Sequence, residues 1–181
     1  MDDRMVWLFV SEIRLQCVFI LTARGRLERA LKAPSAGGFE EIWLQLQIIL
    51  AAAANISKIL WGSGSARDAA RREAERKPLR DRLGVADDSP LRDPDLRNDF
   101  EHFDERLERW LETNPDGNFI GRNVMPVRAL DALPRAAGSS HHRFHHYDPE
   151  TGEVTFWTHT VSIPAVVTEA ERLWAYVQDS F

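Results

Sequence analysis

Three polar residues near the middle of the chain have types and spacing that could act on a phosphate: Arg97, Asn98 and His102. Residues advance by about 100° each around a helix, so Asn98 and His102, four positions apart, share one face. Arg97 lies about 140° from His102 and reaches that face only through its long side chain. A guanidinium can hold phosphate oxygens, and an imidazole can move protons near neutral pH.

A single amphipathic helix over 93–113 is predicted to carry these residues. Asp93 is a suitable N-cap, and Pro94 suits the first helical position because it needs no donor there. Asn114, Pro115 and Gly117 are expected to end the helix. Apolar residues recur at helical spacing and predict one buried stripe: Leu96, Phe100, Phe103, Leu107 and Leu111.

This motif on an amphipathic helix resembles the signature of the HEPN family, in which an Arg is followed by four to six residues and a His, often with a polar residue directly after the Arg. In active members two copies of the motif meet near a dimer interface and form one metal-independent ribonuclease site. The resemblance implies RNA as substrate, a homodimer, no cofactor, and a toxin or defence setting with an antitoxin or other regulatory protein as partner. Members modified by a partner nucleotidyltransferase carry Tyr two places after the His, where this chain has Asp104.

The resemblance also implies a role for each residue of the motif. His102 would remove the proton of the RNA 2′-hydroxyl or protonate the leaving oxygen. Arg97 would hold the scissile phosphate and stabilise its added negative charge, and Asn98 would orient His102 or the phosphate. A non-functional interpretation stays open, in which Arg97 pairs with Asp93 or Glu101 on the surface and His102 is merely exposed.

A strongly basic segment precedes the motif. Residues 66–83 contain seven Lys and Arg and four Asp and Glu, a local net charge of +3, whereas 93–112 has a local net charge of −5. The simpler interpretation is a solvated helix face with i,i+4 ion pairs. The alternative is an RNA-backbone contact through Arg71, Arg72 and Arg76, with this segment beside the acidic motif helix.

Composition narrows the class of protein. The chain has 181 residues, 44% of them hydrophobic, and a net charge of −5, so any contact with RNA must be local rather than a property of the whole chain. The one cysteine, Cys17, lies in an apolar run and is expected to be a buried small hydrophobe. The acidic start is unlike a signal peptide, and polar residues interrupt the long apolar segments, so we expect no membrane span and a cytoplasmic protein.

The hydrophobic periodicity predicts an all-α fold, an antiparallel HEPN-like helical bundle. Besides the motif helix, we expect helices over 4–32, 39–61, 66–83 and 164–178, with Pro78 bending or splitting the third. A short helix is expected over 127–133. In the second helix one face is marked by six residues: Trp43, Leu46, Leu50, Ala53, Ser57 and Leu60.

Near the C-terminus, 143–148 and 153–160 flank Pro149-Glu-Thr-Gly152 and predict a small β-hairpin. We expect a single domain over 1–181, with 141–181 as an appendage. Four nearby histidines, His141, His142, His145 and His146, could approach RNA. His142 and His146 could bind a metal if they share a strand face, but no ligand set is complete and no functional metal is expected.

Two further functions stay open beside the ribonuclease. The first is a non-catalytic HEPN-like module that binds a nucleotide, RNA or a protein partner. The second is a helical-bundle metalloprotein that uses His102 and the histidines of 141–146. Cleavage of RNA in the presence of a chelator distinguishes the ribonuclease from the metalloprotein, and loss of cleavage on replacing His102 distinguishes it from the binding module.

Overall fold

The computed structural model describes residues 2–32, 37–62, 66–92, 102–113, 118–120, 122–133, 141–143, 145–156 and 159–180. The chain divides into two compact units, Met1–Pro94 with Ala165–Phe181 and Asp95–Pro164. The chain is mainly helical, as its periodicity predicts, and also contains a small four-stranded sheet.

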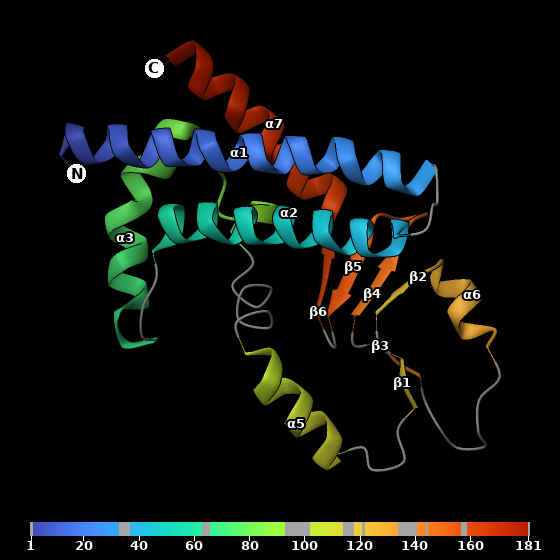
Figure 1. Ribbon diagram of the computed structural model, residues 1–181. Coiled ribbons are helices and arrows are strands. Elements are labelled where there is room, and N and C mark those ends of the chain that lie inside the picture. The colour runs from blue at the N-terminus through green and yellow to red at the C-terminus, as the bar shows by residue number, and fades with distance from the viewer. Residues whose placement is uncertain are drawn as a thin grey trace. The chain divides into compact units, whose positions relative to one another are not determined.

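Two long helices form the centre of the first unit. Helices α1 (Asp3–Lys32) and α2 (Gly38–Trp61) lie side by side and antiparallel (Figure 1). Residues spaced three and four apart on α1 form its buried face: Val6, Val10, Ile13, Cys17, Ile20, Ala23 and Leu27. All six positions of the predicted α2 face are buried, and Cys17 is 0% exposed, so the face and the buried cysteine are confirmed.

Helix α3 (Ala66–Leu83) runs through Pro78 without a break, so of the two predicted effects of Pro78 the split is wrong, and a bend stays a prediction. A proline inside a helix removes one backbone donor and crowds the carbonyls of the preceding turn. The carbonyl that loses its donor is that of Ala74, four positions before Pro78, and Arg80 Nη1 donates to the carbonyl oxygen of the preceding residue, Glu73, at 3.1 Å. After α3 a short 3-10 helix, η1 (Pro90–Arg92), packs near α2.

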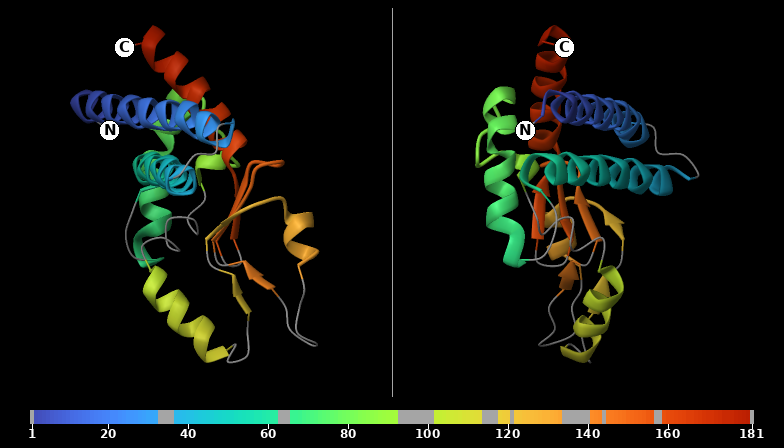
Figure 2. Two further views of the ribbon diagram at one scale, coloured as in Figure 1. Left: turned by 45° about the vertical axis from the view of Figure 1, so that its right-hand side comes forward. Right: turned by 90° about the vertical axis from the view of Figure 1, so that its left-hand side faces the viewer.

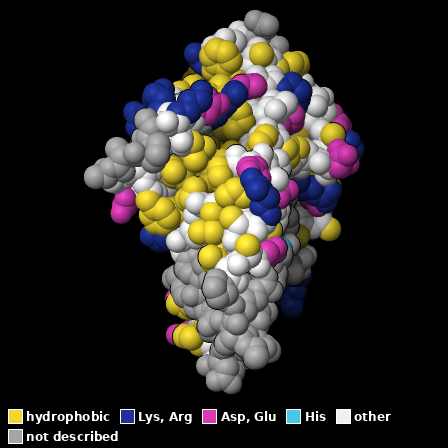
Figure 3. Space-filling model, turned by 90° about the vertical axis from the view of Figure 1, so that its right-hand side faces the viewer, with side chains coloured by type: hydrophobic (Ala, Val, Ile, Leu, Met, Phe, Trp, Pro, Cys, Tyr) yellow, Lys and Arg dark blue, Asp and Glu magenta, His cyan; other side chains and the backbone are white. Residues whose placement is uncertain are grey.

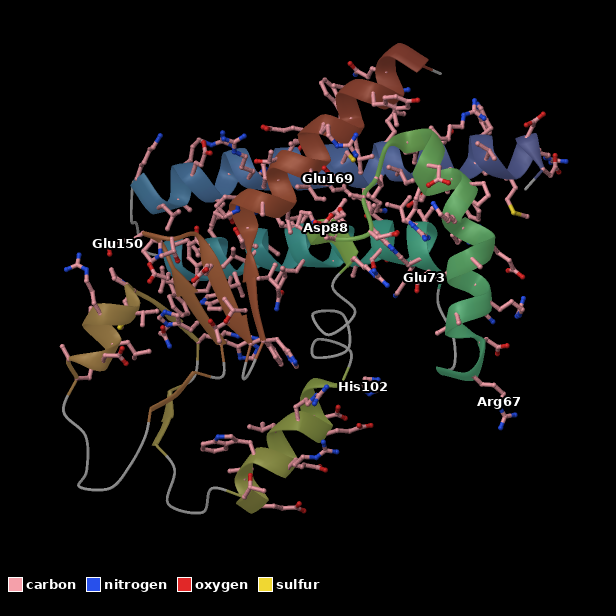
Figure 4. All side chains as sticks on the ribbon, turned by 180° about the vertical axis from the view of Figure 1, so that it is seen from behind. Arg67, Glu73, Asp88, His102, Glu150 and Glu169 are labelled. Atoms are coloured by element: carbon pink, nitrogen blue, oxygen red, sulfur yellow. The ribbon has the colours of Figure 1, made fainter. Side chains whose placement is uncertain are left out.

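The last helix, α7 (Ile163–Ser180), belongs to the first unit from Ala165 onward, although the sequence groups it with the hairpin. The Tyr176 hydroxyl donates to the Arg82 carbonyl oxygen at 2.7 Å, and Arg172 Nη1 donates to the Leu83 carbonyl oxygen at 3.2 Å. Opposite views place α3 and α7 on the same side of the α1–α2 pair: α1 and α2 are in front in Figure 1, and α3 and α7 are in front in Figure 4.

The second unit contains a short helix, the sheet and a separate strand pair. Its described elements are α5 (Phe103–Thr113), β1 (Asn118–Ile120), β2 (Asn123–Val124), α6 (Val127–Asp131), β3 (His141–Arg143), β4 (His145–Asp148), β5 (Glu153–Phe156) and β6 (His159–Ser162). The sheet has the order β2-β4-β5-β6, with β2 parallel to β4 and the other pairs antiparallel. Strands β1 and β3 form a separate parallel pair (Figure 2).

The predicted hairpin is present, but it is only part of the sheet. Strands β4 and β5 pair with His145 opposite Phe156 and Asp148 opposite Glu153. Gly152 in their turn has a φ of +72°, and a Cβ there would lie 2.7 Å from Cγ of Pro164, so the turn needs glycine. The second predicted strand, 153–160, is wrong as one element, because β5 ends at Phe156 and β6 pairs back onto it from His159.

Candidate functional site

The motif helix is described from its middle onward. Helix α5 begins at Phe103, and the Arg106 N–H donates to the His102 carbonyl oxygen at 3.0 Å, which closes its first turn. Two acidic residues, Asp104 and Glu105, lie in this first turn, where the helix dipole favours negative charge. Arg97 and Asn98, and with them the predicted helix start at Asp93, lie outside the described residues.

His102 lies at the N-terminal end of α5 with its side chain at the surface (Figure 4). The side chain is 53% exposed, and Nδ1 lies 3.5 Å from Oε1 of Glu105. At that length the contact is electrostatic rather than a good hydrogen bond. The geometry leaves the imidazole accessible to a phosphate from solvent, as proton transfer requires, and it equally fits an exposed histidine beside Glu105.

Helix α5 is held on the sheet by a small apolar cluster. Trp110 and Phe156 are 2% and 1% exposed, and Leu107 packs against them. The Phe156 ring in turn meets the buried His145 ring edge-on, with ring centroids 4.5 Å apart. The predicted stripe is therefore wrong at Leu111, which is 57% exposed. Trp110 follows Leu107 by three positions, so helical spacing alone fits either residue.

The three arginines predicted to contact RNA lie on α3 and make contacts within the first unit. Arg71 donates to Glu75 at 2.6 Å and to Asp68 at 3.4 Å, the i,i+4 and i,i+3 pairs of the simpler interpretation. The Arg76 guanidinium lies 4.2 Å from the centroid of the Phe9 ring. Arg71 nevertheless keeps 59% of its side chain exposed, so it can reach a ligand at the surface.

A fourth arginine of this segment is structural. Arg80 is 3% exposed, and its Nη1 donates to the Leu60 carbonyl oxygen at 2.7 Å, near the C-terminal end of α2. Its Nε lies 3.5 Å from Oδ1 of Asp87. Counting Arg80 with the surface charges of 66–83 therefore overstates how basic that surface is. Because α3 and α5 belong to different units, their predicted proximity stays a prediction.

Two of the four clustered histidines are buried. His145 is 7% exposed, and burial, with the nearby positive charge of Arg122, lowers its pKa to about 4. His146 is 0% exposed, and its Nδ1 shares a hydrogen bond with Oδ1 of Asn123 on β2. Both side chains are therefore part of the folded sheet rather than available to RNA.

The metal site considered from the sequence needed His142 and His146 on one strand, but residues 141–148 do not form one continuous strand. The segment is divided between β3, which pairs with β1, and β4, which pairs with β2 and β5. The side chains of His141 and His142 lie outside the described residues. Across the part of the chain that the structure describes, no three His, Cys, Asp or Glu side chains are grouped closely enough to hold a metal ion.

A buried carboxylate that the sequence analysis missed organises the turn between β4 and β5. Asp148 is 4% exposed and accepts hydrogen bonds from the backbone N–H groups of Val127 at 2.8 Å and Glu150 at 2.8 Å. Burial raises the pKa of Asp148, and these hydrogen bonds outweigh that effect, so its pKa is below the ordinary value. Its position just before Pro149 and Gly152 was the available signal, since Asp commonly accepts from backbone in turns.

Comparison with known proteins does not identify a family for the chain, so the sequence motif is the basis for any family assignment. No protein-family model, curated protein or solved structure matches the chain.

Proposed function

We propose that the chain is a metal-independent endoribonuclease of the HEPN type that acts as a homodimer. The observation that carries the proposal is the exposed His102 imidazole at the start of α5, five positions after Arg97 in the sequence. Further support comes from the anchoring of α5 through Trp110 and Phe156, because a catalytic side chain needs a rigid element beneath it. The toxin or defence setting belongs to the proposal through the family resemblance alone.

The proposed reaction needs only proton transfer and charge stabilisation. One His102 imidazole removes the proton of a 2′-hydroxyl, and that oxygen forms a bond to the neighbouring phosphorus. The bond from phosphorus to the 5′-oxygen breaks, and the partner's His102, in its protonated form, supplies a proton to that oxygen. The products are a 2′,3′-cyclic phosphate and a 5′-hydroxyl. Arg97 stabilises the additional negative charge on the phosphate as the new bond forms.

The acidic surface of α5 makes the basic residues essential to this proposal. Helix α5 carries four acidic residues that repel the negatively charged RNA backbone: Asp104, Glu105, Glu108 and Glu112. Binding of RNA near His102 therefore depends on Arg97 and on positive charge from another surface. We propose the exposed arginines of α3 for this role, in the same or the partner subunit.

Alanine variants test the proposal. Purified wild type should cut an RNA pool to products with cyclic phosphate ends. Arg97→Ala and His102→Ala should lower the rate by about 100-fold or more, because each removes a direct contact to the reacting phosphate. Asn98→Ala should lower it less, because Asn98 orients rather than reacts.

Arg109→Ala is the matched control, because Arg109 is an exposed arginine on α5 outside the motif. Circular dichroism of each variant checks that it is folded. Wild type that binds RNA without cutting it would reject catalysis in favour of a binding module. Equal losses in Arg109→Ala and Arg97→Ala would attribute the effect to general charge.

A further inference from the structure

Helix α1 has a second apolar face besides the buried one. Six of its large hydrophobic side chains are at least 40% exposed, and five of them share one face, each between 40% and 58% exposed: Trp7, Leu8, Leu15, Val18 and Phe19. At about 100° per residue these positions lie opposite Ile13, Ile20 and Leu27, which face the core. We call these five residues the α1 stripe. On the face drawn in Figure 3, hydrophobic side chains lie at the surface among charged ones.

The α1 stripe lies toward the upper end of the apolar patch sizes that monomers expose to water. At roughly half exposure, five side chains of this size present on the order of 500 Å² of apolar surface. The largest apolar patch on a typical monomer is about 300–600 Å², whereas a stable interface buries about 800 Å² on each partner. Leu44 on α2, 50% exposed, adds to the apolar surface of the same helix pair. The α1 stripe could therefore supply more than half of the area that each partner of a stable dimer buries, and the residues around it must supply the rest.

The charges of α1 are complementary to those of a second, antiparallel α1. Residues 2–13 contain Asp2, Asp3, Glu12 and Arg4, a net charge of −2. Residues 14–32 have a net charge of +4, from five Lys and Arg and one Glu. The sign changes between residues 13 and 14, which is also the midpoint between Leu8 and Phe19. An antiparallel pair centred there places each acidic half beside a basic half, whereas a parallel pair would place like charges together.

A protein is also a better partner than lipid for the exposed apolar surface of α1. By length and composition alone, both α1 and α2 could cross a membrane, but 56% of the qualifying stretch of α2 is buried in the protein. Beside the α1 stripe, Glu12 and Arg14 are exposed, and both are costly to place in hydrocarbon. Ala51 on α2 is exposed and small, so the backbone of another helix can approach closely.

We propose that the α1 stripe is the interface with a second copy of this chain, in which two α1 helices pack antiparallel about a two-fold axis near residues 13 and 14. Leu15 then lies next to its symmetry mate, and Leu8 lies beside Phe19 of the partner subunit. The α1 stripe would be the surface that joins the homodimer of the proposed function. The evidence for it is the exposure and the charge pattern of α1, which do not depend on whether the protein cleaves RNA.

Sedimentation equilibrium of the full chain tests the interface. Wild type should sediment with twice the 20.7 kDa mass of one chain. Leu15→Glu places two charges at the two-fold axis and should weaken the dimer by about 100-fold or more. Because Leu15 is already 45% exposed, the variant should fold normally.

Leu133→Glu is the control, since Leu133 is 41% exposed and follows α6, outside both the α1 stripe and the motif helix. A wild type that stays monomeric, or a dimer that Leu15→Glu leaves intact, overturns the proposal. A monomer that instead floats with vesicles of anionic and neutral phosphatidyl lipids, and loses this in Leu15→Glu, would replace the second copy with a membrane surface. A dimer that does not cleave RNA would contradict the proposed function and leave the interface standing.

Single cysteines test the antiparallel geometry separately. The native Cys17 is 0% exposed, so an introduced surface cysteine is the main reactive thiol. Leu15→Cys should form a disulfide-linked dimer under mild oxidation, because its two copies lie near the axis. Leu8→Cys alone should not, since its copies lie about 16 Å apart along the helix. A mixture of Leu8→Cys and Phe19→Cys should link. Rapid linking of Leu8→Cys alone would contradict the antiparallel pair.

Discussion

His145 is buried in the sheet, and its burial favours the neutral form of the imidazole. It lies on β4, edge-on to Phe156, and its pKa is lowered from 6.5 to about 4 by burial and by Arg122. An unfolded chain takes up the proton near pH 6.5, but the folded chain takes it up only near pH 4. Folding stability is therefore fully present above pH 6.5 and falls as the pH decreases from 6.5 towards 4.

This linkage predicts a loss of about 2 kcal/mol at pH 4 relative to pH 7 from His145 alone, after allowance for screening by solvent. His145→Gln should remove that dependence, whatever its effect at pH 7. Urea unfolding between pH 4 and pH 7 measures the two slopes. Parallel pH profiles for wild type and variant would show that the His145 proton is not linked to folding. Asp148 also contributes, since its pKa is lowered in the folded chain, and the stability this gives begins to be lost at the acid end of the same window.

At the scale of elements, hydrophobic periodicity predicted the long helices almost to the residue. Helices α1, α2 and α3 begin and end within one residue of the predicted 4–32, 39–61 and 66–83. Each has a sustained apolar period or charge pattern bounded by Gly or Pro, so local signals suffice. Pro149 and Gly152 likewise located the β4–β5 turn correctly.

The shorter strands could not be predicted in the same way. Strands β1 and β2 contain three and two residues, too few for an alternating pattern, and they pair in parallel with segments over 20 residues away. The burial of Arg80 and His146 also depends on partners distant in sequence, the Leu60 carbonyl and Asn123. Of the candidate site, the sequence predicted the helix that contains α5, and exposure of His102 belonged to the non-functional alternative. The predicted apolar stripe contained Leu111, whereas the structure buries Trp110 and leaves Leu111 exposed.

The docking of α5 on the sheet predicts unequal effects of two neighbouring substitutions. Trp110→Ala should lower the free energy of unfolding by about 3–5 kcal/mol, because it empties the site beside Phe156. Leu111→Ala should change it by less than about 0.5 kcal/mol, because that side chain is mostly exposed. Chemical denaturation of both variants provides the measurement. Similar losses in the two would mean that α5 packs through a different face.

The basic face of α3 predicts how RNA binding depends on salt. Changing Arg71, Arg72 and Arg76 to Glu should weaken binding and reduce its salt dependence, because each phosphate contact releases counterions. Arg128→Glu is the control, since its side chain is 77% exposed and lies on α6. Fluorescence anisotropy with a labelled RNA at several salt concentrations measures both quantities. Binding that the triple variant leaves unchanged would assign these arginines to the ion pairs and ring contact of α3 alone.

For the molecule as a whole, the proposals require that two chains form a dimer before RNA can be cleaved. The net charge of −5 gives RNA no general attraction, so affinity must come from local basic surfaces brought together. If the α1 stripe joins two copies and the site needs two motifs, cleavage should fall with dilution in parallel with the dimer. His102 would then act only in an assembled pair.

The most direct measurement is RNA cleavage by purified protein in excess EDTA, with wild type and His102→Ala compared at the same concentration. The proposed mechanism uses the 2′-hydroxyl as nucleophile and an imidazole for proton transfer, so wild type should cut as fast with EDTA as without it. His102→Ala should be folded, dimeric and at least about 100-fold slower. Cleavage that EDTA abolishes, or that His102→Ala retains, would contradict the proposed ribonuclease.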